Sequence, residues 1–158
     1  MNYQELNVAL MESFGDLEQL CNQQYDDYHG VTCYIKHMEE LDDKGCRYVD
    51  DWDDCYQQLI HVRHKRNKLS HGEVSFSSQY AEKEDVLFVR EFRESILNTT
   101  DPISRLRKAL KAKKKNSAKR QTQANAQPQQ SIRYIGLVLY LLAVIAFGIA
   151  LLYFFYFK

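Results

Sequence analysis

An arginine and a histidine near the middle of the chain are the residues best placed to do chemistry. They lie in the stretch Arg66-Asn67-Lys68-Leu69-Ser70-His71-Gly72. The guanidinium group of an arginine stays charged at all ordinary pH values, and the imidazole of a histidine can accept or release a proton near neutral pH. The pair therefore offers a fixed positive charge and a titratable group to a ligand.

The elements that must position this pair follow from the spacing of apolar residues. Steps of three and four residues back from Leu69 reach Val62, Leu59, Cys55 and Trp52. This spacing predicts an amphipathic helix that begins near residue 51, with Gly72 just past its end. Arg66 falls on the same apolar stripe, where a charged group is costly unless it has a partner or a ligand.

An Arg-Asn pair followed after three residues by His-Gly, at the end of an amphipathic helix, resembles the motif of the HEPN superfamily. The resemblance covers roughly residues 1–112. It implies a metal-independent endoribonuclease in which His71 takes the proton of the RNA 2′-hydroxyl, Arg66 holds the scissile phosphate and Asn67 orients the imidazole. It also implies a homodimer whose two motifs line one cleft, with no metal and no cofactor, of the sort that prokaryotes use as toxin or defence effectors.

The neighbouring basic residues are candidates for contacts with the RNA substrate: Arg63, His64, Lys65 and Lys68. The alternative is an ordinary basic helix end, in which these cations complement the helix dipole. In that case the domain is a non-catalytic HEPN-like interaction or sensor module. The two hypotheses differ in whether Arg66 and His71 open onto a cleft or are satisfied within the domain.

The rest of residues 1–112 is also predicted to be helical. Asn2 and Glu5 are placed for a capping box at the start of a long first helix, and Asp101 and Pro102 suit the N-cap and first position of a last one. Shorter helices are expected near residues 34–41 and after Ser78. Together these features predict an all-α bundle of four to five helices. The first helix has an apolar face at steps of three and four, formed by Leu6, Leu10, Phe14, Leu17, Cys21, Tyr25 and Tyr28.

Two other groups of residues have metal-ligand chemistry. His29, Cys33 and His37 recur at steps of four, but Gly30 and Thr32 are expected to break the helix that would align them. The acidic residues at 50, 51, 53 and 54 are more typical of a helix N-terminus, where carboxylates complement the dipole. No metal site is predicted.

The C-terminal part of the chain is predicted to attach the domain to a membrane. Residues 113–131 are interpreted as a basic and polar linker, and residues 132–158 as a transmembrane tail anchor. The 24 residues of Tyr134–Phe157 carry no charge and would span roughly 36 Å as a helix. Basic residues precede this run, which predicts a single-pass protein with its N-terminal domain in the cytoplasm. The linker residues expected at anionic lipid headgroups, or else at RNA phosphates, are Lys113, Lys114, Lys115, Lys119 and Arg120.

Charge is distributed very unevenly along the chain. All 21 acidic residues lie in 1–101 beside 10 Lys and Arg, which gives −11, whereas residues 102–158 carry 11 Lys and Arg and no acid. An acidic domain repels a polyanion unless its cleft is locally basic. The sequence identifies neither an RNA substrate nor a partner protein.

Overall fold

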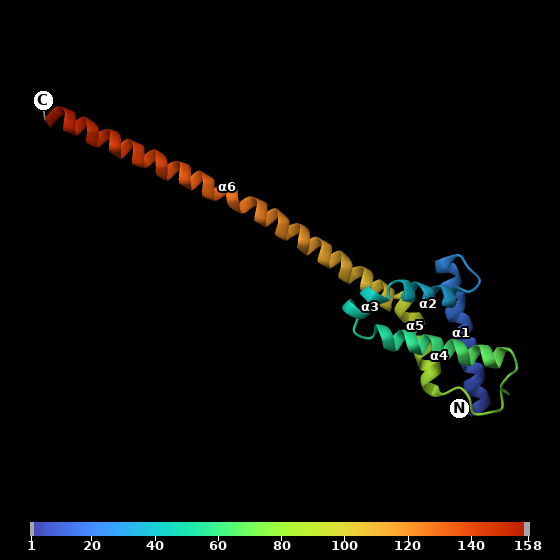
Figure 1. Cartoon of the computed structure of the whole chain (residues 1–158). Coiled ribbons are helices and arrows are strands. Elements are labelled where there is room, and N and C mark those ends of the chain that lie inside the picture. Colours follow the sequence, from blue (N-terminus) through green and yellow to red (C-terminus); the bar gives the residue numbers. More distant parts are fainter. Residues whose placement is uncertain (1, 157–158) are drawn as a thin grey trace. The chain divides into compact units, whose positions relative to one another are not determined.

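This computed structural model describes residues 2–156, without the side chains of 122–133 and 151–155. In this part of the chain there are six helices and no strand (Figure 1). The all-α fold class is therefore confirmed. The chain divides into two units, Met1–Leu110 and Lys111–Lys158. The helices are α1 (Tyr3–Tyr25), α2 (Gly30–Glu40), α3 (Asp42–Tyr48), α4 (Trp52–Ser70), α5 (Lys83–Leu97) and α6 (Pro102–Tyr156).

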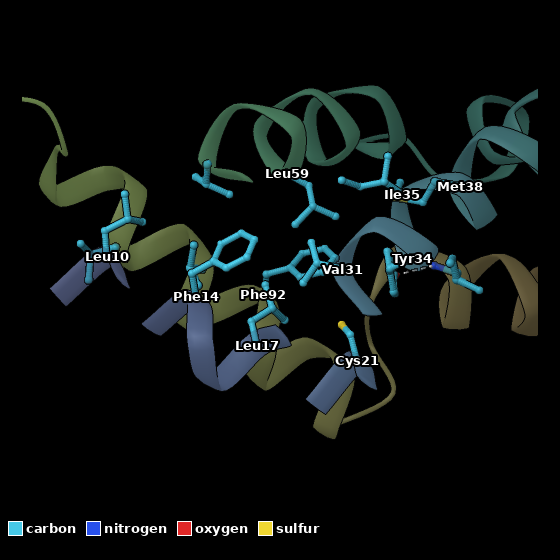
Figure 2. Packing of buried hydrophobic residues seen from close by; sticks show 14 of the residues in the cluster. Leu10, Phe14, Leu17, Cys21, Val31, Tyr34, Ile35, Met38, Leu59 and Phe92 are labelled. Carbon is cyan, nitrogen blue, oxygen red and sulfur yellow. Dashed lines mark hydrogen bonds between the residues drawn. The ribbon is translucent and has the colours of Figure 1, made fainter. Parts of the chain in front are cut away.

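The first unit is built around α1, which packs mainly on α2 and α5 and to a lesser extent on α4. Its start is the predicted capping box, because Asn2 Oδ1 accepts from Glu5 N at 2.8 Å and Glu5 Oε2 accepts from Asn2 N at 2.9 Å. The apolar face of α1 then meets side chains of the neighbouring helices in one core (Figure 2). The buried α1 side chains at its centre are Leu10, Phe14, Leu17 and Cys21.

Two glycines set how closely helices approach in this core. A Cβ atom at Gly30 would lie 2.2 Å from the main-chain nitrogen of Asn22, and one at Gly45 would lie 2.1 Å from the Trp52 ring. A helix break was expected at Gly30 and Thr32. The break lies just before them, between the end of α1 at Tyr25 and Gly30, which is the first residue of α2 and lets α2 contact α1. The short helix α3, which contains Gly45, was not predicted at all.

The amphipathic helix predicted to begin near residue 51 is α4. Its apolar stripe is buried at Trp52, Leu59, Val62 and Leu69. Its C-terminus is a Schellman motif. The main-chain nitrogen of Gly72 donates to Leu69 O, that of residue 73 donates to Lys68 O, and Gly72 has φ +71°. Gly72 thus ends the helix as expected, since a left-handed residue is least costly as glycine.

The last helix begins as predicted. Asp101 Oδ1 accepts from the main-chain nitrogen of Ser104 at 3.2 Å, and Pro102 is the first helical residue. Ile103 and Leu106 bury this first part of α6 in the first unit. Residues 113–131, predicted as a linker, belong to the same helix.

The predicted transmembrane anchor, and with it the single-pass membrane localisation, is corrected by the structure. Within the described residues, no helix is both long and apolar enough to cross a membrane. The side chains described in this part of α6 are those of 134–150. Most of the remainder of the predicted span lies outside the described residues.

A buried asparagine attaches the loop between α4 and α5 to α1. Asn7 Nδ2 donates to the carbonyl oxygens of Phe76 and Ser78 at 2.9 and 2.8 Å, and its Oδ1 accepts from Ala81 N at 2.8 Å. Asn7 is fully buried. Its hydrogen bond with Ala81 is buried, and those with Phe76 and Ser78 are partly buried. The loop is therefore held in place by one side chain.

We expect Asn7→Ala to lower the free energy of unfolding by about 2–4 kcal/mol, because it leaves buried main-chain groups of the loop without partners. Urea unfolding of the full chain can be followed by the fluorescence of its single, buried tryptophan, Trp52. Gln19→Ala, at an exposed position of the same helix, is the control. Equal effects of the two substitutions would contradict this role of Asn7.

Candidate functional site

The structure places Arg66 against the core of the first unit. Its guanidinium carbon lies 5.4 Å from the centre of the Phe14 ring, and its Nη1 donates to Asn67 Oδ1 at 3.1 Å. The side chain is half-buried. An aromatic face attracts a cation, so the ring of Phe14 explains how a charged residue is accommodated on the apolar stripe of α4.

The three predicted catalytic residues are only partly brought together. Asn67 Oδ1 accepts from Arg66 rather than from His71, and the contact between His71 and Asn67 is a main-chain hydrogen bond of 2.9 Å. His71 is exposed at the end of α4. The cavities described below are lined by other residues, and a catalytic role for His71 stays a prediction.

Lys65, predicted at the substrate, is instead part of a buried ion pair. Its Nζ lies 2.7 Å from Asp85 Oδ2, and the two side chains are 11% and 2% exposed. Asp85 also accepts from the main-chain nitrogen of Glu82 at 2.9 Å, and His61 Nε2 lies 3.5 Å from its other oxygen. This carboxylate therefore joins α4 to the start of α5. Of the other three predicted substrate contacts, Arg63 and Lys68 are half-buried and His64 is exposed.

The basic end of α4 faces an acid on α1. Burial raises the pKa of Glu18, while the positive charges of Arg66, His29 and Arg63 act in the opposite direction. Because partly buried charges are screened less than exposed ones, Glu18 offsets part of the positive potential that a polyanion would meet here.

The residues with metal-ligand chemistry do not form one site. His29 precedes α2, whereas Cys33 and His37 lie one turn apart on it. Cys33 and His37 line a hollow of about 340 Å³ together with Tyr25. The hydroxyl of Tyr25 lies 2.9 Å from His37 Nδ1. Separately, donor atoms of Asp42, Cys46 and Asp53 lie within 4.8 Å of one another, all on exposed side chains. Exposed groups of this kind are common without an ion, so no metal is assigned.

A cavity of about 320 Å³ lies between α4, α5 and the start of α6, and no pattern in the sequence predicts it. It continues into a neighbouring hollow that shares Cys55 and Phe88 and adds Asp54, Gln57 and Gln58. We refer to the cavity and this hollow together as the α4–α5 groove. The residues that line the cavity itself are Asp51, Cys55, Phe88, Glu91, Phe92, Ser95, Thr100, Pro102 and Arg105.

An ion pair forms the polar wall of the groove. Arg105 Nη2 lies 2.6 and 2.8 Å from the two carboxylate oxygens of Asp51. Burial tends to raise the pKa of Asp51, but the hydrogen bond and charge of Arg105 outweigh it and hold this pKa below its ordinary value. The only cation among the lining residues is thus already paired with an acid.

The apolar wall is a pair of stacked aromatic rings. The centres of the Phe88 and Phe92 rings lie 5.6 Å apart at 29°. Phe92 is buried and also meets the edge of the Tyr34 ring at 5.2 Å, so the wall is anchored in the core (Figure 2). Cys55 closes the groove on the side of α4, and burial, helped by the charge of Asp51, raises the pKa of its thiol to about 11.

Comparison with known protein families identifies a match over residues 8–155 to a family of unknown function, DUF6548. The chain belongs to this family. No curated protein and no solved structure matches it. The resemblance to the HEPN superfamily is therefore wrong, since the family found is a different one and the Arg-Asn-His motif is too short to outweigh a match over most of the chain. The ribonuclease and the toxin or defence role rested on that resemblance and lose their support.

We expect Lys65→Met in this DUF6548 protein to lower the free energy of unfolding by about 3–5 kcal/mol, because it leaves the buried carboxylate of Asp85 without its cation. His64→Met, at the exposed neighbouring position, should change stability by less than about 0.5 kcal/mol. Urea unfolding measures both. A small effect of Lys65→Met would show that the ion pair is dispensable.

The raised pKa of Cys55 predicts slow alkylation at neutral pH. With a pKa of about 11, only about one thiol in a thousand is ionised at pH 8, and the thiolate is the reactive form. Its rate with iodoacetamide, mapped by peptide mass spectrometry, should rise steeply between pH 8 and pH 11. The exposed Cys46 is the reference thiol, because its pKa is raised mainly by a hydrogen bond to Asp42 and not by burial. Equally rapid labelling of both at pH 8 would contradict the burial of Cys55.

Proposed function

We propose that the unit Met1–Leu110 is a non-catalytic interaction module that binds a lysine- or arginine-rich segment of a partner protein. The observation that carries the proposal is a concentration of exposed carboxylates at one end of the bundle, which we call the acidic end. Electrostatic complementarity of this kind favours encounter with a positively charged partner and suppresses wrong ones. The acidic end consists of Glu39, Glu40, Asp42, Asp43, Asp50, Asp51, Asp53 and Asp54.

The acidic end is formed by the C-terminus of α2, by α3 and by the first turn of α4, which pack on one another (Figure 1). All of its carboxylates are exposed except the half-buried Asp51. Within 39–54 the only basic residues are Lys44 and Arg47. Together with Arg105, which is paired with Asp51, eight acids stand against three bases and leave a negative surface that a basic segment would neutralise.

Two further observations support a binding role over catalysis. Arg66 contacts Phe14 and Asn67 inside its own unit, and Lys65 is paired with Asp85. The positive charges that nuclease chemistry needs at a scissile phosphate are thus engaged in structural contacts. The proposed function keeps the interaction module that was the alternative hypothesis from the sequence. It does not include the membrane tether or the HEPN assignment.

The test is binding of a fluorescently labelled peptide of alternating lysine and alanine to the full chain, measured by anisotropy in a neutral detergent. We expect saturable binding that weakens about tenfold or more between low and physiological salt, because exposed charges are screened. A variant with Glu40→Gln, Asp43→Asn and Asp50→Asn should bind about tenfold more weakly.

The matched control removes the same number of charges elsewhere on the first unit. Glu12→Gln, Asp16→Asn and Glu73→Gln alter exposed acids outside the acidic end and should leave the dissociation constant unchanged within about twofold. Equal losses in both variants would mean that only net charge matters. Absence of binding by the unaltered chain would refute the proposed function.

A further inference from the structure

We propose that the α4–α5 groove receives one bulky apolar side chain of the same partner segment, flanked by its basic residues. This inference rests on the proposed function and names the part of the partner that gives it specificity. The groove and the acidic end are continuous, because Asp51 and Asp54 belong to both. A segment bound along the acidic end is therefore next to the groove.

The walls of the groove match an apolar group. Phe88, Phe92 and Pro102 provide its apolar surface, and the stacked rings of Phe88 and Phe92 are held in place by the contact of Phe92 with Tyr34. Small-molecule sites usually enclose about 300–1,000 Å³. The cavity of about 320 Å³ lies at the lower end of this range and suits a single side chain, and the neighbouring hollow of about 470 Å³ leaves room for the residues beside it.

The charges at the mouth of the groove match basic neighbours on either side of that side chain. Arg105 is paired with Asp51, whereas two exposed acids line the groove together with Phe88: Glu91 of α5 lines the cavity, and Asp54 of α4 lines the neighbouring hollow. Lysine and arginine can lay their methylene groups on an aromatic surface while their charged ends stay in water. The groove thus favours cations around an apolar centre.

The test compares two peptides of equal charge on the full chain in neutral detergent. Both consist of lysine and alanine, and one carries a phenylalanine at its centre. Because burying a phenylalanine side chain is favourable, we expect this peptide to bind about tenfold or more tightly than the alanine peptide. Ser95→Leu, which fills the cavity, should abolish the difference and leave binding of the alanine peptide unchanged.

A second measurement needs no substitution in the groove. Alkylation of Cys55 at about pH 9, where the lysines are still charged, should slow at least fivefold when the phenylalanine peptide is bound, and much less with the alanine peptide. Cys33, a half-buried thiol in the separate hollow beside His37, is the internal reference and should react at the same rate throughout.

The outcomes separate this inference from the proposed function. If both peptides bind equally tightly, the groove has no role and the acidic end alone is the site. If neither binds, the proposed function fails and the inference with it. The phenylalanine peptide could still bind more tightly than the alanine peptide in Ser95→Leu, and Cys55 could remain unprotected. The apolar contact would then lie elsewhere. Protection of Cys55 in a dimer without peptide would make a second copy of the chain the occupant. Either of these results overturns the inference.

Discussion

The buried hydroxyl of Tyr34 is the contact on which the arrangement of four helices depends. It donates to Asp101 Oδ1 at 2.6 Å, and the ring meets the edges of Tyr25 and Phe92. Burial raises the pKa of this hydroxyl, which keeps it a neutral donor. Asp101 in turn caps α6, so this bond holds the start of α6 against α2. Arg105, one turn later, reaches the first turn of α4 from that starting point and completes the groove.

Features encoded by neighbouring residues could be predicted from the sequence. The capping box of Asn2 and Glu5, the Schellman end at Gly72 and the start of α6 at Pro102 each depend on a few consecutive residues, because helix termini satisfy their own main-chain groups locally. The start of α2 could not be predicted in this way. Gly30 lies so close to α1 that a Cβ atom there would overlap its main chain, and no spacing within the sequence predicts that contact.

The candidate site was harder to predict for the same reason. The positions of Arg66 and His71 at the end of a helix were correctly anticipated, but the chemistry inferred from them depended on what surrounds them. The ring of Phe14, far from Arg66 in the sequence, decides how Arg66 is accommodated. The groove is formed by residues of α4, α5 and α6. In the sequence, nothing distinguishes Arg105 from the other cations that precede the apolar segment. Only the uneven distribution of charge was visible in advance.

Gly30 and Gly45, the two glycines in close helix contacts, allow the core packing of members of this family to be compared from their sequences. Any side chain at Gly30 would overlap the main chain of α1, and one at Gly45 would overlap the indole of Trp52. Main-chain atoms cannot move aside as a flexible side chain can, so the first overlap has to separate α1 from α2. A relative with a larger residue at the equivalent of Gly30 must therefore have a differently spaced core. Aligned sequences alone could sort the members by architecture on this basis.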